Sequence, residues 1–249
     1  MGKAYYKALG YYPGSIGGLK FKLDPYHIGF WRNVEKGRWE PHTFKILSEL
    51  IGSDTIYCDL GAWIGPTVLY AARKCREVVC FEPDPVAFRY LYWNIELNGL
   101  SNIRAFNGAL ADCNAILKMS SLGKCLGDSM TSLLAADKGG NGIDVITMTW
   151  EKFIELSHID KIDFIKIDIE GGEFQLLPAM KKYLVSYKPV IYLSIHPFYL
   201  DPAIRREKKR QILELMKIYG KCLDMNLVRL DIDSLISSDS YGNSFLFLD

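Results

Sequence analysis

Four short apolar runs along the chain predict buried β-strands. They lie at Thr55–Leu60, Glu77–Glu82, Asp163–Ile169 and Pro189–Ile195. Each run is mostly hydrophobic and bounded by polar or turn-forming residues, which is typical of parallel strands that are covered on both faces. The four runs therefore predict the centre of a parallel β-sheet.

A helix is predicted directly after the second run. Asp84 supplies an N-cap followed by a first-turn proline, and Asn98 with the next glycine ends the segment. Between these limits apolar residues recur every fourth position, at Ala87, Leu91 and Ile95, which predicts an inward-facing stripe. Strands that alternate with helices of about 10 to 15 residues predict an α/β fold with a doubly wound sheet.

Three parts of the chain break this alternation. Residues Ser120–Gly142 are rich in Gly, Ser and Asp and predict either a long loop or a hairpin outside the main sheet. Residues Asn243–Asp249 predict a strand at the edge of the sheet. The first fifty residues predict a strand pair and a helix at Pro41–Ile51. We therefore expect an N-terminal extension, 1–50, packed on one main domain, 51–249.

Length and charge narrow the class of protein. A chain of 249 residues fits one large α/β domain. Its formal net charge of +1 provides no general attraction for nucleic acid, so we expect none as a partner. The basic run Ile204–Arg210 lacks interleaved aromatic residues, and it predicts the solvated face of a helix.

Cysteines and apolar segments bear on the compartment. The six cysteines form no C-x-x-C pair, which favours free thiols in a reducing environment. No apolar run approaches the ~20 residues that are needed to span a bilayer, and the first residues lack the apolar stretch of a signal peptide. We therefore expect a cytoplasmic protein with no membrane span.

A glycine-containing turn, "DLGAWIGPT", follows the first predicted strand and opens a helix. In open α/β sheets, ligands bind beyond the carboxyl ends of the strands. Gly61 and Gly65 stand four residues apart, and Trp63 occupies the place of the middle glycine that a dinucleotide site needs against its pyrophosphate. The turn therefore predicts a ligand without phosphates at this position.

Glu82 ends the second run about twenty residues after the glycines, where an acidic side chain accepts hydrogen bonds from both ribose hydroxyls of a nucleoside ligand. A ribose without a pyrophosphate indicates S-adenosylmethionine. In the alternative interpretation Glu82 only caps the next helix.

Five motifs together resemble the FkbM family of S-adenosylmethionine-dependent methyltransferases. They are "DLGAWIGPT", "CFEPDP", "NGALAD", "IDFIKIDIEGGEFQLL" and "SIHPFYL", and the resemblance covers most of Gly37 to Asp249. "KIDIEGGE" is the most specific stretch, because the glycine turn alone would fit any class I methyltransferase. The resemblance implies the Rossmann-like class I fold, with a mostly parallel seven-stranded sheet and an antiparallel last strand. It also implies methyl transfer to oxygen, on a small-molecule or glycan acceptor such as a sugar.

The resemblance further implies where the cofactor binds. "GRWE" resembles a motif that precedes the fold in family members, so Glu40 is expected to accept a hydrogen bond from the ammonium group of the methionine moiety. The complete set of predicted cofactor-binding residues is Glu40, Asp59, Gly61, Ala62, Trp63, Gly65, Thr67, Glu82, Pro83, Asp84, Ala109, Leu110 and Asp168.

Two positions depart from the family pattern. The glycine turn usually reads "GANIG", so Trp63 replaces a small polar residue and changes what packs against the cofactor. A carboxylate is expected shortly before His196, but Ser194 stands two residues ahead. The second departure weakens any scheme in which His196 is the base.

Asp168, Glu170 and His196 are the predicted catalytic residues, because they end the third and fourth apolar runs. Side chains alternate along a strand, so Asp168 and Glu170 are expected on one face, beside His196 if the two strands are neighbours. Methyl transfer requires an aligned acceptor oxygen and a group that takes its proton. A carboxylate, or an imidazole with its ordinary pKa of about 6.5, can do so. In the alternative interpretation both acids only cap the following helix.

Several alternatives stay open. Asp168, Glu170 and His196 could also hold Mg²⁺ or Mn²⁺, which we do not favour because three ligands without a known spacing make a weak signal. A nicotinamide-dependent oxidoreductase would share Glu82 but needs the missing middle glycine, and a silent binding module would keep the fold alone. Residues Gly127–Leu133 predict a lid over the acceptor or a mobile loop. The identity of the acceptor and the oligomeric state are also open.

Overall fold

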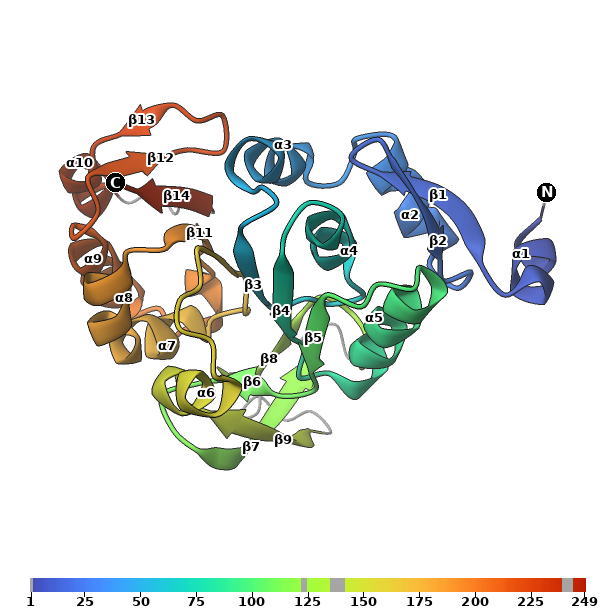
Figure 1. The fold of residues 1–249 in the computed structure, drawn as a ribbon. Helices are drawn as coiled ribbons and strands as arrows, with labels where there is room; N and C mark the ends of the chain where they lie inside the picture. Colours follow the sequence, from blue (N-terminus) through green and yellow to red (C-terminus); the bar gives the residue numbers. More distant parts are fainter. Residues whose placement is uncertain (1, 122–124, 135–141, 239–243) are drawn as a thin grey trace.

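The centre of the molecule is a β-sheet with the strand order β13-β12-β14-β11-β10-β3-β4-β5 (Figure 1). The structure is a computed structural model, and it describes residues 2–121, 125–134, 142–238 and 244–249. The strands of this sheet are β3 (Ile56–Leu60), β4 (Glu77–Phe81), β5 (Ile103–Phe106), β10 (Phe164–Ile167), β11 (Val190–Ser194), β12 (Lys221–Leu223), β13 (Arg229–Leu230) and β14 (Ser244–Leu248). Strands β11, β10, β3, β4 and β5 are parallel, which confirms the predicted doubly wound, mostly parallel sheet.

The four apolar runs form four adjacent strands, β11, β10, β3 and β4. One detail of the prediction is wrong. Strand β10 ends at Ile167, so Asp168 and Glu170 follow the strand and do not alternate along it. Glu170 has a left-handed backbone with φ of 50°, and this turn places its side chain.

The last strand is not at the edge of the sheet, as the sequence analysis expected. Strand β14 is antiparallel to β11 and also pairs with β12, so β13 is the outermost strand on that side. The short strands β12 and β13 add a hairpin beyond β14, which gives the sheet eight strands where seven were expected. The antiparallel direction of β14 is confirmed.

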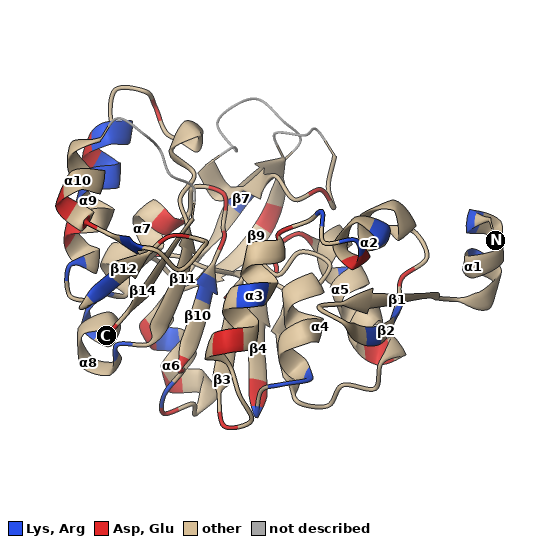
Figure 2. Ribbon diagram, turned by 90° about the horizontal axis from the view of Figure 1, so that it is seen from above, with Lys and Arg blue, Asp and Glu red and all other residues tan. Residues whose placement is uncertain are grey.

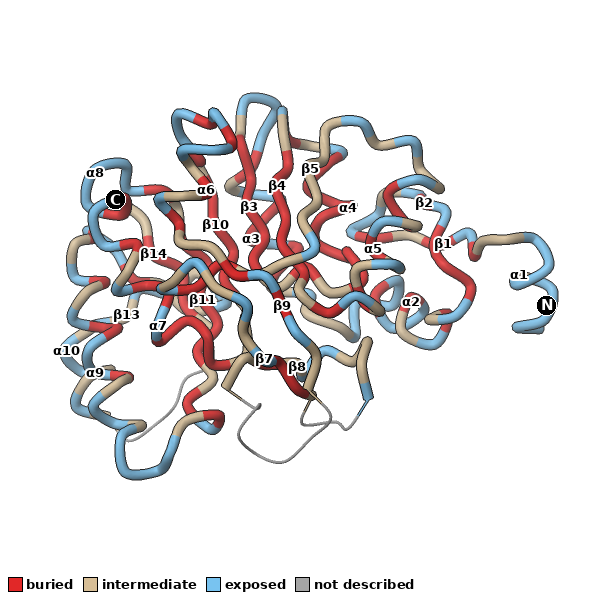
Figure 3. Tube along the Cα trace, turned by 90° about the horizontal axis from the view of Figure 1, so that it is seen from below, coloured by how far each residue is buried: buried red, intermediate tan, exposed pale blue. Residues whose placement is uncertain are grey.

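Helices cover both faces of the sheet, because alternate side chains of its strands enter two different hydrophobic clusters. Cys58 and Leu60 of β3 pack on one side, and Tyr57 packs on the other. Buried residues run through the central strands, whereas the outer faces of the helices are exposed (Figure 3). The first side is covered by α6 (Trp150–Ser157), α7 (Glu173–Ala179), α8 (Lys181–Tyr187) and α9 (Arg205–Met216), and the second by α3 (Pro41–Leu50), α4 (Pro66–Ala72) and α5 (Pro85–Leu97).

Helix α5 forms where the sequence placed it. The Asp84 carboxylate accepts hydrogen bonds from the backbone N–H groups of Val86 and Ala87, which confirms the predicted N-cap. Ala87, Leu91 and Ile95 are buried against the sheet, which confirms the inward stripe.

Helix α9 contains most of the predicted basic run (Figure 2). Arg206 and Arg210 are exposed, whereas Arg205 and Lys208 are half-buried and Lys209 is buried, so only part of the run forms a solvated face. Helix α10 (Ile232–Ser237) packs on α9.

The N-terminal segment contains the predicted strand pair and helix. It consists of α1 (Lys3–Leu9), β1 (Tyr12–Ile16), β2 (Leu19–Leu23) and α2 (Ile28–Glu35), followed by α3. Its buried residues, such as Ile16 and Trp31, belong to the same hydrophobic cluster as Tyr57 of the main sheet. Helix α1 buries no side chain and extends away from the rest of the molecule (Figure 1). The domain boundary at residue 50 stays a prediction.

Within the stretch Ser120–Gly142, the described residues include the end of one strand, β7, and the whole of another, β8, which belong to a second sheet of order β6-β9-β7-β8. Strand β7 is antiparallel to β8 and to β9, so the described part agrees with the hairpin interpretation. Residues 122–124 and 135–141 lie outside the described part. The strands are β6 (Ala109–Leu110), β7 (Ala115–Ser121), β8 (Thr131–Ser132) and β9 (Ile143–Met148).

The structure bears on two features that the sequence analysis used to predict the compartment, the cysteines and the apolar segments. All six cysteines are free, and four of them are buried. Among the described residues, none of the helices combines the length and the apolar character that crossing a bilayer requires. The cytoplasmic location stays a prediction.

Candidate active site

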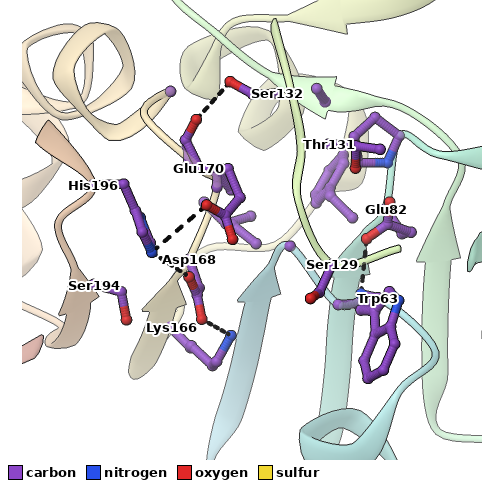
Figure 4. A pocket seen from close by; sticks show the side chains of 18 of the residues that line it. Trp63, Glu82, Ser129, Thr131, Ser132, Lys166, Asp168, Glu170, Ser194 and His196 are labelled. Atoms are coloured by element: carbon purple, nitrogen blue, oxygen red, sulfur yellow. Dashed lines mark hydrogen bonds and ion pairs between the residues drawn. The ribbon is translucent and has the colours of Figure 1, made fainter. Parts of the chain in front are cut away.

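A cavity of about 320 Å³ opens at the carboxyl ends of β3, β4, β10 and β11 (Figure 4). This is the edge of an α/β sheet at which ligands bind, and the volume is in the range of small-molecule sites. Most of the predicted site residues line this cavity. They are Glu40, Gly61, Ala62, Trp63, Thr67, Glu82, Pro83, Ala109, Leu110, Asp168, Glu170 and His196.

The remaining three predicted residues, Asp59, Gly65 and Asp84, lie behind the wall of the cavity. The side chain of Asp59 is fully buried and paired with Lys166. Gly65 has φ of 93°, and a Cβ there would lie 2.6 Å from a methyl carbon of Leu91, so this glycine allows α4 to start close to α5. Asp84 caps α5. These three residues therefore support the wall, and direct contact with a cofactor stays a prediction.

Gly61 brings the glycine turn against the end of β10. Its φ is 86°, and a Cβ at this position would overlap the carbonyl oxygen of Asp168. No other residue type fits without moving one of the two loops. The glycine thus sets the close approach of the two loops that form the floor of the cavity.

Glu82 lies at the tip of β4 and is bound by two backbone N–H groups. Its Oε2 accepts from the N–H of Trp63 at 2.7 Å (Figure 4). Its Oε1 accepts from the N–H of Asp84 at 2.8 Å. Burial raises the pKa of Glu82 to about 7 despite these two bonds. The carboxylate therefore changes its protonation state near neutral pH.

Trp63, the departure from the family pattern, connects three parts of the site. Its indole Nε1 donates to the carbonyl of Gly127 at 2.9 Å. Its ring meets the ring of Phe30, from α2, edge to face at a centroid distance of 4.6 Å. The N–H of Gly127 donates to Asp84 Oδ2 at 2.6 Å. The tryptophan thus joins the glycine turn to the N-terminal segment and to the segment Gly127–Leu133.

The segment Gly127–Leu133 borders the cavity. Asp128, Ser129, Thr131, Ser132 and Leu133 line it. The hydroxyl of Ser132 donates to the carbonyl of Glu170 at 2.5 Å (Figure 4). The segment is therefore bonded to the site at both of its ends, which favours the lid interpretation over a free loop.

Three residues of the cavity have a left-handed backbone that side chains rarely adopt. They are Glu40, Trp63 and Glu170, with φ of 39°, 48° and 50°. Such conformations cost free energy and cluster at sites where the surrounding structure imposes them. The arrangement indicates that the positions of these three side chains matter more than the local backbone preference.

Lys166 is a buried cation that the sequence analysis missed. Its Nζ lies 3.4 Å from Asp59 Oδ1 and 3.4 Å from Asp168 Oδ2. Burial lowers the pKa of Lys166, but the carboxylates of Asp59 and Asp168 outweigh it and raise the pKa. A sequence signal existed: a lysine inside an apolar run needs a buried partner, and Lys166 pairs in register with Asp59 on the adjacent strand.

His196 follows β11 and faces the two acids at the tip of β10, which confirms that the two strands are neighbours. Its Nε2 lies 3.4 Å from Asp168 Oδ1 and 3.8 Å from Glu170 Oε2 (Figure 4). Burial lowers the pKa of His196, but Glu173, Asp168 and Glu170 outweigh it and raise the pKa to about 9. The pKa therefore lies above the ordinary value of about 6.5, which favours the protonated ring at neutral pH.

Glu173, in the first turn of α7, is the second residue that the sequence analysis missed. Its side chain is fully buried, and its Oε1 accepts from the backbone N–H of His196 at 2.5 Å and lies 3.4 Å from His196 Nδ1. Its Oε2 accepts from the N–H of Gly171 at 2.9 Å. Glu173 thus supplies the carboxylate that was expected shortly before His196, from a different element.

The three predicted catalytic residues are also grouped closely enough to share a cation. One ligand atom each from Asp168, Glu170 and His196 lies within 4.8 Å of the other two. The same atoms form the ion pairs described above, so the grouping fits a metal-free site as well. A divalent metal stays possible, and the expectation that it is not favoured stays a prediction.

Comparison with known proteins places this site in a family. Residues 59–221 match the model of the methyltransferase FkbM domain. The chain is 26% identical to Methyltransferase 1 of Beauveria bassiana over 148 residues, which is 51% of this chain and 59% of the relative. It is 26% identical to the hexuronic acid methyltransferase AglP of Haloferax volcanii over 178 residues, which is 67% of this chain and 66% of the relative.

A solved structure of a methyltransferase FkbM from Methylobacillus flagellatus KT has a TM-score of 0.48 and 17% identity, covering 78% of this chain and 43% of the other. The chain spans less than two thirds of both curated relatives. The family match itself covers well over half of the 249 residues. The chain therefore belongs to the FkbM family of methyltransferase domains.

Proposed function

We propose that this protein transfers the methyl group of S-adenosylmethionine to a hydroxyl group of a small molecule or glycan, with a sugar as the acceptor. One observation carries the proposal. A single cavity contains both Glu82 with its glycine turn and the group of Asp168, Glu170 and His196. The family membership supports methyl transfer as the reaction. The Haloferax relative is named a hexuronic acid methyltransferase, which supports a sugar as the acceptor.

The residues of the cavity fit this cofactor. Bound S-adenosylmethionine would supply a methyl group on a positively charged sulfur. Each oxygen of a carboxylate has two lone pairs, so Glu82 can accept from ribose hydroxyls while it keeps its two backbone partners. Glu40, whose Oε2 accepts from the hydroxyl of Thr43 at 2.9 Å, lies at the same cavity and can hold an ammonium group. Buried carboxylates on both sides suit a ligand with net positive charge.

His196 is our candidate for the base that takes the proton of the acceptor hydroxyl. Its Nε2 faces the cavity side of Asp168 and Glu170, while its Nδ1 faces Glu173. A proton on Nδ1 is stabilised by the buried Glu173 carboxylate, which leaves Nε2 to accept the hydroxyl proton. Only the neutral ring can act in this way. With a pKa raised to about 9, the reaction is expected to be faster at mildly alkaline pH.

The two alternative functions lack a supporting observation. A nicotinamide site needs backbone against a pyrophosphate, and here Trp63 is fixed in that place by its bond to Gly127. A silent binding module would not need an ion-paired histidine at the cavity. The expectation that nucleic acid is not a partner rests on the near-neutral charge and stays a prediction.

Titration calorimetry with S-adenosylmethionine, S-adenosylhomocysteine and NAD⁺ tests the proposal. We expect both sulfur compounds to bind and NAD⁺ not to bind. In Glu82→Ala, the loss of charge-assisted bonds to ribose should weaken S-adenosylmethionine by about 1.5–3 kcal/mol per bond, which is about ten- to a hundredfold. Binding of NAD⁺ alone, or unchanged affinity in this variant, would contradict the proposal.

A further inference from the structure

We infer that the acceptor carries no negative charge near the hydroxyl that is methylated. The site fits a neutral, hydroxyl-rich molecule such as an unmodified hexose, and it disfavours a uronate or a phosphorylated sugar. This inference rests on the proposed function, because it assigns a chemical class of acceptor to the same cavity.

The side chains that line the cavity are mainly acidic. We call the segment Gly127–Leu133 the lid segment. The carboxylates of the cavity come from the N-terminal segment, the tip of β4, the lid segment and the tip of β10, and they are Glu40, Glu82, Asp128, Asp168 and Glu170. Among the described residues, the cationic groups that line the cavity are Lys166 and His196, and no arginine does. Among the described residues of the lining, acidic side chains therefore outnumber cationic ones.

Both cationic groups are already paired with carboxylates. The side chain of Lys166 is 5% exposed and lies between Asp59 and Asp168. His196 lies between Asp168 and Glu170 on one side and Glu173 on the other. Neither group can turn toward an anionic ligand without leaving a buried carboxylate unpaired, which is costly.

An anionic group beside the reacting hydroxyl would meet the carboxylates of Asp168 and Glu170, and both cationic groups among the described lining residues are already ion-paired. Proteins usually recognise carboxylates and phosphates by the bidentate bonds of arginine, and the lining residues that the structure describes include no arginine. Like charges placed together in this way act against the wrong ligand and so create specificity.

The same lining is well suited to neutral hydroxyl groups. Carboxylates accept strong hydrogen bonds from hydroxyl donors. Hydroxyl side chains stand on both sides of the cavity, at Ser129, Thr131 and Ser132 in the lid segment and at Ser194 and Ser244 on β11 and β14. The last two face each other with their oxygens 3.1 Å apart.

An aromatic ring completes the acceptor side. Phe198 lines the cavity, is 51% exposed, and meets the ring of His196 edge to face at a centroid distance of 5.8 Å. An exposed apolar ring next to hydroxyl groups can pack against the C–H face of an uncharged sugar ring. The Haloferax relative is named for a hexuronic acid, so the acceptors of the two proteins would differ in charge.

Matched pairs of acceptors test the inference. Methyl glucoside and methyl galactoside are compared with the corresponding uronates, in the presence of S-adenosylhomocysteine, by saturation-transfer NMR. Methyl transfer from S-adenosylmethionine to each compound is followed in parallel. We expect binding and transfer to favour the neutral member of a pair by at least about tenfold, a factor that corresponds to about 1.4 kcal/mol.

A charge variant strengthens the test. Asp128→Asn removes a negative charge from the cavity while keeping an acceptor oxygen for the N–H of Met130, and it should raise the ratio of uronate to neutral binding by about threefold or more. Asp144→Asn, on exposed β9 and outside the cavity, is the control and should leave the ratio unchanged.

The outcomes distinguish a failure of this inference from a failure of the proposed function. Tighter binding or faster methylation of the uronates, or binding of neither member, would overturn the inference even though S-adenosylmethionine still binds. Failure of the proposed function looks different, because S-adenosylmethionine itself would then not bind in the calorimeter.

Discussion

At the scale of single residues, the surroundings of His196 change its titration clearly. Its pKa is raised from about 6.5 in an unfolded chain to about 9 in the folded protein, because three carboxylates outweigh the effect of burial. The folded state therefore holds the proton of His196 more tightly than the unfolded state does. By linkage, the ion pairs of His196 stabilise the fold fully below pH 6.5, and this contribution is lost as pH rises through 9.

We predict that His196→Gln lowers the free energy of unfolding by up to about 3 kcal/mol near pH 6, since a shift of one pKa unit corresponds to about 1.36 kcal/mol. The difference between variant and parent should shrink as pH rises and vanish near pH 10. Urea unfolding across this pH range measures it. His42→Gln, at a histidine with none of the cavity contacts, is the control. A difference that is independent of pH would show that packing, and not charge, is lost.

Glu82 leads to a second prediction at the same scale. Its pKa of about 7 means that lowering the pH protonates the carboxylate that we expect to bind the ribose. Affinity for S-adenosylmethionine should fall as pH decreases below 7, by at most about tenfold per unit, and binding near pH 7 should release protons. Calorimetry in buffers of different ionisation enthalpy detects that release. Glu82→Gln should remove it, and persistence of the release would assign it to another group.

At the level of elements, two loops meet where β3 and β10 end, and Gly61 allows this contact. We predict that Gly61→Ala destabilises the protein by more than about 3 kcal/mol, because its methyl group would overlap the carbonyl oxygen of Asp168 in a left-handed backbone. Gly18→Ala is a matched control, since Gly18 has a similar φ of 81° but open space around it. Its cost should be about 1 kcal/mol, the strain of the backbone alone. Equal costs in urea unfolding would refute the role of the contact.

The sequence was informative about elements that have a strong apolar signal. The runs that became β3, β4, β10 and β11 are buried on both faces. Strands of this kind can be recognised in a sequence because they are continuous apolar runs. The hairpin of β12 and β13 was missed because its strands have three and two residues. The position of β14 inside the sheet depends on that hairpin, so the edge was placed wrongly. The exact end of β10 depends on the left-handed turn at Glu170, which a sequence pattern does not encode.

Contacts between distant elements were harder to predict than the elements. Most of the predicted cofactor and catalytic residues line one cavity, because the carboxyl ends of parallel strands meet at the same edge of a sheet. Lys166 and Glu173 were missed because their partners come from other elements, Asp59 on β3 and His196 after β11. The raised pKa of His196 depends on the same contacts and could not be derived from its position in the chain.

On the scale of the whole molecule, most of the predicted cofactor-binding and catalytic residues line one cavity, and the segment Gly127–Leu133 is hydrogen-bonded to Trp63 and to Glu170. The N-terminal segment contributes Trp39 and Glu40 to its wall, and the second sheet contributes the lid segment. We propose that these parts have separate roles. The group at the tips of β10 and β11 performs the chemistry, while the glycine turn and Glu82 hold the cofactor.

Methyl transfer to a neutral hexoside by the parent protein, Glu170→Gln and His196→Ala, measured together with their affinities for S-adenosylmethionine, tests this claim most directly. Both variants should bind the cofactor nearly as well as the parent. His196→Ala should transfer the methyl group at least about 100-fold more slowly, the usual contribution of a general base. Glu170→Gln should also be slower at pH 9 and above, where the ring of His196 is largely neutral in both proteins, because it removes a carboxylate that orients this ring. Full activity in both variants on an acceptor that the parent methylates would contradict the account and leave these side chains with a structural role alone.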